Sequence, residues 1–297
     1  MTDTPWHGLE GFEAVAPLTG PFGHAAFLSA VERHTGEGDL LLAGDGEGAT
    51  MLSVGPGGIR LAGPEHLTDY HTPLGSGSAD VLAATLEPMH GMPYRFDSLP
   101  VEAAAVIDSA LSTLGACPEP AIHESTAVLE LPASYDEWLM SIGKKERHEV
   151  RRKRRRFETE FGEIEVVRSG PEAIDTFCVM HRGSGGAKGS FMTPGMQAFF
   201  LDLLETADAT IHSLTCNGEV RASAFGFETE AGYYFYNSAY DAEAAAASPG
   251  VVLFSAMIEQ EIQRGATVFD FLKGDEPYKY RHGATARPLY LFEGEIP

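Results

Sequence analysis

The sequence predicts an α/β protein, an α+β sandwich in which two domains each have a mixed, mostly antiparallel sheet flanked by helices. Three observations support this prediction. The chain has 297 residues, enough for two domains of ordinary size. Its composition, 43% hydrophobic and 10% aromatic, is sufficient for a packed core. Both halves also show the same order of meander, helix and strand patterns, although no residue-level repeat relates them.

In the first half, short apolar runs separated by glycines predict a meander of strands. The segment DYHTPL is polar and ends in proline and leucine, which favours a loop. The elements expected here are helices over 24–34, 79–89 and 101–114, strands over 40–43, 49–54, 59–62, 94–98 and 126–131, and a loop over 69–74.

In the second half, Asn217-Gly218 is the pair most typical of a two-residue hairpin turn. A strand pattern ends at Leu131-Pro132, which predicts domains 1–132 and 133–297. The elements expected here are helices over 144–161, 171–182, 194–206 and 249–264, strands over 164–167, 209–216, 219–227, 232–240, 268–272 and 288–292, a glycine-rich loop over 183–189 and a polar loop over 273–282.

The charge of the chain is unevenly distributed. The net charge is −22, yet residues 144–156 hold nine of the 21 basic side chains. Such an acidic protein is a poor general binder of nucleic acid. The basic segment is either a solvated helix or a face for an anionic acceptor, an anionic membrane surface or the acceptor stem of tRNA. It has little aromatic interleaving, which argues against sequence-specific reading of RNA.

The cysteines and the terminal sequence indicate the compartment. Cys117, Cys178 and Cys216 have no close spacing, so they form no zinc signature and leave an odd number for disulfides. No apolar run approaches the ~18 residues that a membrane span needs, and the acidic N-terminal sequence has no signal core. We therefore expect a soluble, cytoplasmic protein with reduced thiols and no metal.

The segment Ser248-Pro249-Gly250 has the features of a helix start. We expect the Ser248 hydroxyl to cap the helix and Pro249 to occupy its first position. Small residues at such a mouth let an anion reach free backbone amides, although the same residues can serve only to begin a helix. The apolar strand over 268–272 that follows contains a lone carboxylate, Asp270.

Three stretches together resemble a known family. They are DYHTPL, LPASYDEWLMSIGKKERHEVRRKRRRFE and SPGVVLFSAMIEQEIQRGATVFDFLKGDEPYKYRHG. Their ordered combination resembles the GNAT-like acetyltransferases of the cellulose-biosynthesis-type and FemAB-like family. The resemblance implies two tandem GNAT-like domains, a degenerate one and then an acyltransferase domain. It implies transfer of an acyl group, for instance acetyl, from acyl-CoA to an amine of a small-molecule or sugar-linked acceptor such as a sugar nucleotide.

The resemblance also assigns a donor site. It places the thioester between the strands over 235–240 and 268–272, where the backbone near Asn237, Ser238 and Tyr240 would meet the carbonyl and the pantetheine arm. A second set of residues, Ser248, Gly250 and Val251, would meet the pyrophosphate. The usual Gln/Arg-x-x-Gly-x-Gly/Ala signature is absent before this helix, so acyl-CoA as the donor rests on the resemblance alone.

The loop over 273–282 contains the candidate catalytic groups. By resemblance, Lys279 stabilises the reacting carbonyl and Tyr278 donates to the leaving group. Asp270 is either a general base or a structural carboxylate paired with a loop cation such as Lys279. The alternative for Lys279 is an ordinary surface lysine.

Acceptor contacts are expected from three places. The resemblance places His181 and Arg182 on the acceptor side. Alternatively, these two residues have no role beyond the favourable interaction of positive charge with the C-terminal end of a helix. Arg151 and Arg152 of the basic helix are candidates for an anionic acceptor. Asp69 and Tyr70 of the polar loop either close the same cleft or belong to an ordinary loop.

Two other functions compete with acyl-CoA-dependent transfer. The first is a FemAB-like amide ligase that takes its acyl group from aminoacyl-tRNA. The second is a non-catalytic binding protein that keeps the fold and uses the basic helix on a membrane or a polyanion.

Overall fold

The structure, a computed structural model, describes residue 9, residues 11–36 and residues 39–297. The chain forms two compact units. Unit 1 comprises Met1–Thr126 together with Arg287–Pro297, and unit 2 comprises Ala127–Ala286. The division into domains 1–132 and 133–297 stays a prediction, and it differs from these units in where the last residues belong.

Unit 1 contains a sheet in the order β1-β2-β3-β4-β11, antiparallel except for the parallel pair β3–β4. Fully buried Leu82, Phe96 and Ile107 lie in its core, where helices α2 and α3 pack with the sheet. The elements of this unit are α1 (Ala25–Thr35), β1 (Asp39–Gly44), β2 (Ala49–Gly55), β3 (Gly58–Leu61), α2 (Ser78–Leu86), the 3-10 turn η2 (Glu87–Met89), β4 (Pro93–Leu99) and α3 (Val101–Thr113); β5 (Ala121–Glu130) and β11 (Thr285–Glu295) contribute residues to both units.

Unit 2 contains a sheet in the order β5-β10-β9-β8-β7-β6. The pair β9–β10 is parallel, and β6, β7, β8 and β9 pair antiparallel in succession. Its other elements are α4 (Tyr135–Ser141), α5 (Lys144–Phe161), β6 (Ile164–Ser169), η3 (Pro171–Ala173), α6 (Ile174–Gly183), α7 (Gly186–Phe191), α8 (Pro194–Thr206), β7 (Ala209–Cys216), β8 (Glu219–Glu228), β9 (Gly232–Tyr240), η4 (Ala242–Ala247), α9 (Pro249–Arg264), β10 (Val268–Lys273) and α10 (Pro277–Arg281).

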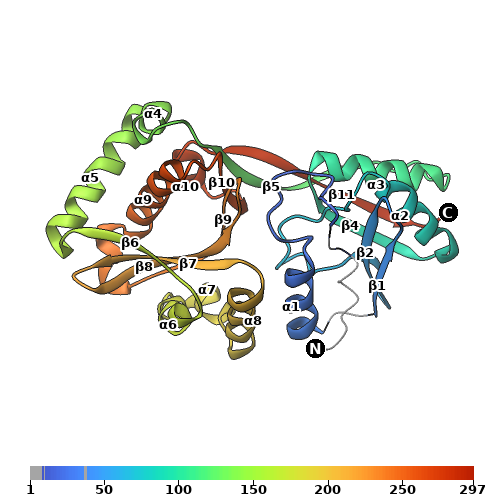
Figure 1. Cartoon of the computed structure of the whole chain (residues 1–297), viewed down its shortest axis with the longest axis horizontal. Coiled ribbons are helices and arrows are strands. Elements are labelled where there is room, and N and C mark those ends of the chain that lie inside the picture. Colours follow the sequence, from blue (N-terminus) through green and yellow to red (C-terminus); the bar gives the residue numbers. More distant parts are fainter. Residues whose placement is uncertain (1–8, 10, 37–38) are drawn as a thin grey trace. The chain divides into compact units, whose positions relative to one another are not determined.

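Helices cover both faces of the unit 2 sheet. Helices α4, α5, α9 and α10 lie on one side of it, and α6, α7 and α8 lie on the other (Figure 1). Helix α9 packs against β7, β8 and β9, and α5 packs on α9. The narrow apolar stripe of α5 is therefore buried through Val150 and Phe157, while its basic faces remain outside the core.

Local sequence explains where several elements begin and end. Asn217 and Gly218 have φ values of 52° and 80°, which suit the type I′ turn of the hairpin β7–β8. The Thr193 side chain caps α8 by accepting from the N–H of Met196. Gly265, with φ 83°, ends α9 in the left-handed region that glycine adopts without strain.

The predicted α/β class is confirmed, and three local expectations are wrong. The polar loop over 273–282 contains the short helix α10, and the glycine-rich loop over 183–189 leads into α7. Ser248 does not cap α9 with its side chain. Its backbone has φ 64° because it also ends the preceding turn η4, and its carbonyl, not its hydroxyl, meets the first amides of α9.

We expect Gly232→Ala to lower the free energy of unfolding by more than about 2 kcal/mol, as severe backbone clashes do. A Cβ at this position would lie 1.9 Å from the Val268 carbonyl oxygen, at the start of the β9–β10 pairing. Gly195→Ala in α8 is the matched control, since a Cβ there meets only Thr193 Oγ1 at 3.7 Å. Urea unfolding measures both, and equal stability of the two variants would show that β10 shifts freely.

Candidate active site

The carboxyl ends of β9 and β10 separate. Their parallel ladder ends at Tyr234 opposite Asp270. Strand β9 nevertheless continues to Tyr240 and β10 continues to Lys273, and in the described chain no further pairing joins them. Beyond Tyr234, this side of β9 therefore has no ladder partner on β10 within the described chain, and buried backbone groups need some partner. This is the separation between 235–240 and 268–272 that the family resemblance implies.

His181 meets β9 at this open end. Its Nε2 lies 3.0 Å from Asn237 Oδ1, which also accepts from the N–H of Ser238 at 2.7 Å. Because an amide oxygen only accepts, Nε2 carries the proton, and the buried Nδ1 has no partner. Burial lowers the pKa of His181, and the cation of Lys188 lowers it further. The structure therefore brings His181, predicted for the acceptor side, into contact with Asn237, predicted for the donor site.

Two neighbouring side chains differ in their surroundings. Arg182 turns away from Asn237, since its Nε donates to the Met192 carbonyl at 2.9 Å and its Nη2 donates to Gln197 Oε1 at 2.6 Å. The partly exposed ring of Tyr240 carries the ammonium of Lys188 over its face, 5.8 Å from the centroid. Sequence reasoning missed Lys188, which stands alone in a run of glycines and small residues.

Asp270 shapes the end of β10. Its side chain is fully buried, and its Oδ1 accepts from the N–H of Leu272 at 2.7 Å. Leu272 has φ 58°, a conformation that costs energy for a branched side chain and needs support from its surroundings. The carboxylate therefore helps to hold the bend in the chain after the ladder.

Lys279 of α10 binds the same bend. Its side chain is 3% exposed, so the alternative of a surface lysine is wrong. The Nζ atom donates to the carbonyl oxygens of Leu272, Lys273 and Gly274 at 3.2, 2.5 and 3.2 Å, and lies 3.0 Å from Glu276 Oε2. These acceptors occupy all the donors of an ammonium group. In this geometry Lys279 binds the backbone carbonyls of the bend. Its Nζ could contact a reacting carbonyl only by breaking one of these hydrogen bonds.

The mouth of α9 offers a free amide. Pro249 has no N–H, and the N–H groups of Val251 and Val252 reach the Ser248 carbonyl at 3.1 and 3.4 Å. Within the described chain, this leaves the Gly250 amide without a backbone acceptor. Because the helix dipole places positive potential at this end, the mouth favours an anionic group.

A cavity of about 270 Å³ lies beside this mouth. Val251 of α9, Tyr278 of α10 and residues of α5 line it. The Tyr278 ring stacks on Phe254, with centroids 5.2 Å apart. Burial raises the pKa of Tyr278, and the nearby carboxylate of Glu276 adds to this, so the hydroxyl keeps its proton at neutral pH.

The basic helix α5 contains cations of two kinds. Arg152 is paired, with Nη2 2.7 Å from Glu149 Oε2. Arg151 and Arg155, in contrast, have no carboxylate within ion-pair distance among the described residues, and with His148 they line a cavity of about 500 Å³ beside α4. Of the two predicted residues on this helix, Arg151 alone has its charge free for a ligand.

Two predicted residues, Asp69 and Tyr70, belong to unit 1. Tyr70 is fully buried, its hydroxyl donates to Thr126 Oγ1 at 2.6 Å, and its ring lies 5.2 Å from the guanidinium carbon of Arg287. These contacts are those of a core residue. Asp69 is half-buried in the same segment.

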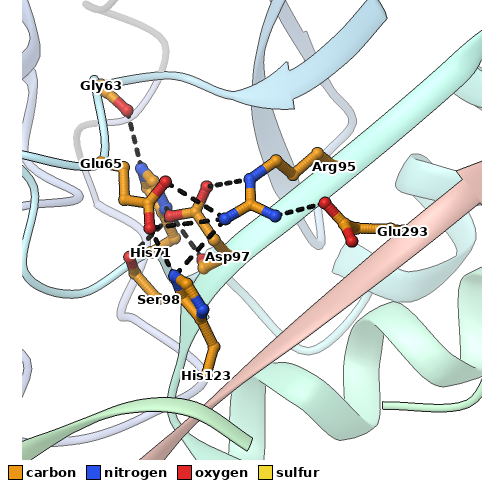
Figure 2. Close-up of polar contacts among 8 residues, drawn as sticks. All are labelled: Gly63, Glu65, His71, Arg95, Asp97, Ser98, His123 and Glu293. Atoms are coloured by element: carbon orange, nitrogen blue, oxygen red, sulfur yellow. Dashed lines mark hydrogen bonds and ion pairs between the residues drawn. The ribbon is translucent and has the colours of Figure 1, made fainter. Parts of the chain in front are cut away.

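The next residue, His71, is enclosed by acceptors (Figure 2). Its Nδ1 lies 2.9 Å from the Asp97 carbonyl oxygen and its Nε2 lies 2.9 Å from the Gly63 carbonyl oxygen. Carbonyl oxygens only accept, so both nitrogens donate and the ring is an imidazolium. Asp97 Oδ1, 3.3 Å from Nδ1, supplies the counter-charge, and Ser98 donates to the same oxygen.

Beside this pair, Glu65, His123 and Glu124 place ligand atoms within 4.8 Å of one another. In Figure 2 the guanidinium of Arg95 points toward Glu65 and His123 on one side and toward Glu293 on the other. Its Nη2 lies 3.3 Å from Glu65 Oε2. Burial raises the pKa of Glu65, but hydrogen bonds from His123 and Arg95 lower it more, so the net pKa is below its ordinary value. The arginine already supplies the positive charge that a metal would bring.

Part of the chain is similar to a known protein family. Residues 144–280 match the family described as the acetyltransferase (GNAT) domain. Comparison with curated proteins finds no match. No helix in the described part of the chain combines the length and apolar character that crossing a membrane requires.

Solved structures share the fold at low identity. FemX aligns with a TM-score of 0.63 at 13% identity, over 89% of this chain and 90% of its own. The C-terminal domain of a putative lysylphosphatidylglycerol synthetase from Agrobacterium fabrum aligns with a TM-score of 0.61 at 13% identity, over 90% of each chain. A protein of unknown function from Bacteroides thetaiotaomicron has a TM-score of 0.63 at 13% identity, over 95% of this chain and 99% of its own. The chain has a GNAT-like α/β fold, and the matched segment includes both strands of the open ladder.

We expect Lys279→Met to lower the free energy of unfolding by roughly 3 kcal/mol, because three carbonyls at the end of β10 lose their donor. Glu276→Gln is the control. It removes only a half-exposed ion-pair partner, so its effect should stay within about 1 kcal/mol. Urea unfolding compares the two, and a Lys279→Met protein as stable as wild type would leave the catalytic prediction for Lys279 as the better one.

Proposed function

We propose that this protein is an N-acyltransferase that moves an acyl group from a thioester to an amine. The supporting observation is the open end of the β9–β10 ladder, next to the helix mouth of α9 and within the GNAT-matched segment. A thioester needs its carbonyl polarised and its anionic end held. The part of β9 that has no ladder partner on β10 and the Gly250 amide suit these two tasks.

The proposed donor is acyl-CoA, with acetyl-CoA as the simplest case. Its pantetheine arm lies between the separated strands, near Asn237, Ser238 and Tyr240. Its pyrophosphate lies at the mouth of α9, near Ser248, Gly250 and Val251. The Ser248 hydroxyl is not used as a cap, so it too is open to a phosphate oxygen.

In the proposed reaction the acceptor nitrogen attacks the thioester carbon. The C–N bond forms, the C–S bond breaks, and the amine loses a proton. The thiolate takes a proton from the Tyr278 hydroxyl, which burial keeps protonated, and the proton that the amine releases passes to the Tyr278 oxygen, so that the net transfer is from the amine to the thiol. The proposed acceptor is a small-molecule or sugar-linked amine, for example of a sugar nucleotide, on the side of His181.

Lys279 and Asp270 have a supporting role in this proposal. Both bind the backbone of the bend that follows β10. They fix the position of the end of β10, which forms one wall of the proposed thioester site. Tyr278 and Lys279 are neighbours on α10, so the same helix carries the proton donor and the group that anchors it.

Gly250→Glu should raise the Kd for acetyl-CoA at least tenfold, because it places bulk and negative charge at the anion site. Gly250→Ala is the matched control, since a Cβ there meets only Phe254 Cε2 at 3.9 Å. Its Kd should stay within about twofold. Calorimetry measures binding, and release of free thiol with a panel of amines measures transfer. Absence of both in the wild-type protein would refute acyl-CoA as the donor.

A second candidate function is transfer from aminoacyl-tRNA, as the FemAB-like resemblance allows. The observation that favours it is the set of cations without carboxylate partners on α5. A basic surface of this kind contacts a phosphate backbone without reading bases.

Changing Arg151 and Arg155 to Gln distinguishes the two donors. With acyl-CoA as the donor, donor affinity should stay within about twofold and the KM of an anionic acceptor should rise. With aminoacyl-tRNA, donor affinity should fall about tenfold and the salt dependence should become less steep. The control is Arg152→Gln with Arg156→Gln, whose side chains have carboxylate partners. Equal effects of the two double variants would show that local cation pairing is irrelevant to binding.

A further inference from the structure

His282 is a buried residue for which neither the sequence nor the proposed reaction supplies a role. It follows α10 and is 4% exposed. Its ring stacks on Trp138, with centroids 6.3 Å apart and planes 7° apart, and contacts the rings of Phe254 and Tyr278. The indole Nε1 of Trp138 donates to the His282 carbonyl at 2.9 Å. The ring is therefore held in one orientation.

The contacts of the ring define its tautomer. Nδ1 lies 2.7 Å from the Tyr278 carbonyl oxygen, which can only accept, so Nδ1 carries a proton. Burial lowers the pKa of His282, although the bond to the Tyr278 carbonyl opposes this, and the cations of Lys153 and Arg281 lower it further. The ring is neutral, and Nε2 presents a lone pair. This buried atom has no hydrogen-bond partner, a state that costs about 1–3 kcal/mol.

His282 lines the cavity of about 270 Å³ beside the mouth of α9. Lys145, Lys153 and Arg281 line the same cavity, and within the described chain they have no carboxylate partner. One of its acidic lining residues, Glu149, is already paired with Arg152. A second carboxylate, Glu146, lines it too, so the walls combine three cations and two carboxylates with the neutral ring of His282.

The size of the cavity limits what it can hold. Its volume of about 270 Å³ is close to the lower end of the ~300–1,000 Å³ range of small-molecule sites. This suits a phosphate group with a short chain attached. Small-molecule sites that enclose a whole drug-sized ligand are usually larger, up to ~1,000 Å³.

We propose that His282 Nε2 accepts a hydrogen bond from an O–H or N–H group that stands next to a phosphate on the ligand of this cavity. The inference rests on the proposed function, in which that ligand is the phosphorylated end of the acyl donor. Lys145, Lys153 and Arg281 hold the phosphate, and His282 selects for the neighbouring donor group. A bare anion satisfies the cations and leaves Nε2 unpartnered. Two sources carry this chemistry: the pantetheine phosphate arm of an acyl-CoA and the ribose phosphate end of an aminoacyl-tRNA.

The first experiment uses the wild-type protein. Histidine labelled with ¹⁵N reports Nε2 of His282, whose resonance is that of an unprotonated nitrogen in the free protein. Pantetheine 4′-phosphate or the trinucleotide CCA, whichever matches the true donor, should shift this resonance toward the hydrogen-bonded range. Inorganic pyrophosphate, which brings charge without an adjacent donor group, should leave it unchanged. A resonance that no probe shifts, or that pyrophosphate shifts equally, would overturn the proposal.

The second experiment uses variants in a Trp6→Phe background, which leaves Trp138 as the sole tryptophan and its fluorescence as a folding and binding signal. His282→Phe keeps an aromatic ring and removes the acceptor. The Kd of the matching organic phosphate should rise about tenfold, while that of pyrophosphate changes by less than twofold. Arg281→Gln is the control and should weaken both ligands by similar factors. A His282→Phe protein that binds both ligands as wild type does would also refute the proposal.

Thiol release separates this inference from the proposed function. Acyl transfer with no effect of His282 on binding would reject the inference alone. A ligand-dependent Nε2 shift without any acyl transfer would reject the proposed function and keep the binding site.

Discussion

The end of strand β10 depends on two buried charges that bind backbone. Asp270 accepts from the Leu272 amide, and Lys279 donates to the three carbonyls that follow in the bend. Neither charge is isolated, because each has the hydrogen bonds that a buried charge needs. Together they stabilise a bend containing a leucine in the left-handed region, and this bend takes β10 away from β9. The separation of the strands is therefore built into the fold and does not need a ligand to create it.

The cationic side chains of α5 fall into two groups, those paired with a glutamate and those without such a partner. Some arginines are paired with glutamates on the helix itself, and Arg154 is also paired with Glu259 of α9, a contact that helps to hold α5 on α9. Other cations line cavities on either flank of the helix. A segment that looks uniformly basic thus has a structural set and an unpaired set. The two sets differ only in which side chains have a glutamate within reach, and a net charge does not reveal this.

Patterns within a few residues predicted most of the fold. The Asn217-Gly218 turn, the apolar strand of β10 and the amphipathic α9 follow from local chemistry, and the structure contains all three. The predictions of local structure failed where one residue belongs to two adjacent elements. Ser248 ends one turn and begins α9, so its backbone takes a conformation that a simple cap does not. Lys279, Tyr70 and His282 are buried because segments distant in the sequence pack on them. The polarity of these side chains does not predict that burial. His282 was missed because it looks like an ordinary loop histidine beside Arg281 and Gly283.

The pairing of β4 with β11 has a consequence for biosynthesis. Residues 93–99 of unit 1 find their partners at 290–295, about two hundred positions later in the chain. Phe292 and Ile296 also complete the core around Phe96. A ribosome must therefore make all of unit 2 before unit 1 can close its sheet, and until then the edge of β4 stays unpaired, the kind of edge that invites aggregation. Unit 2 can therefore complete its sheet during synthesis before unit 1 does, although most of unit 1 comes earlier in the sequence.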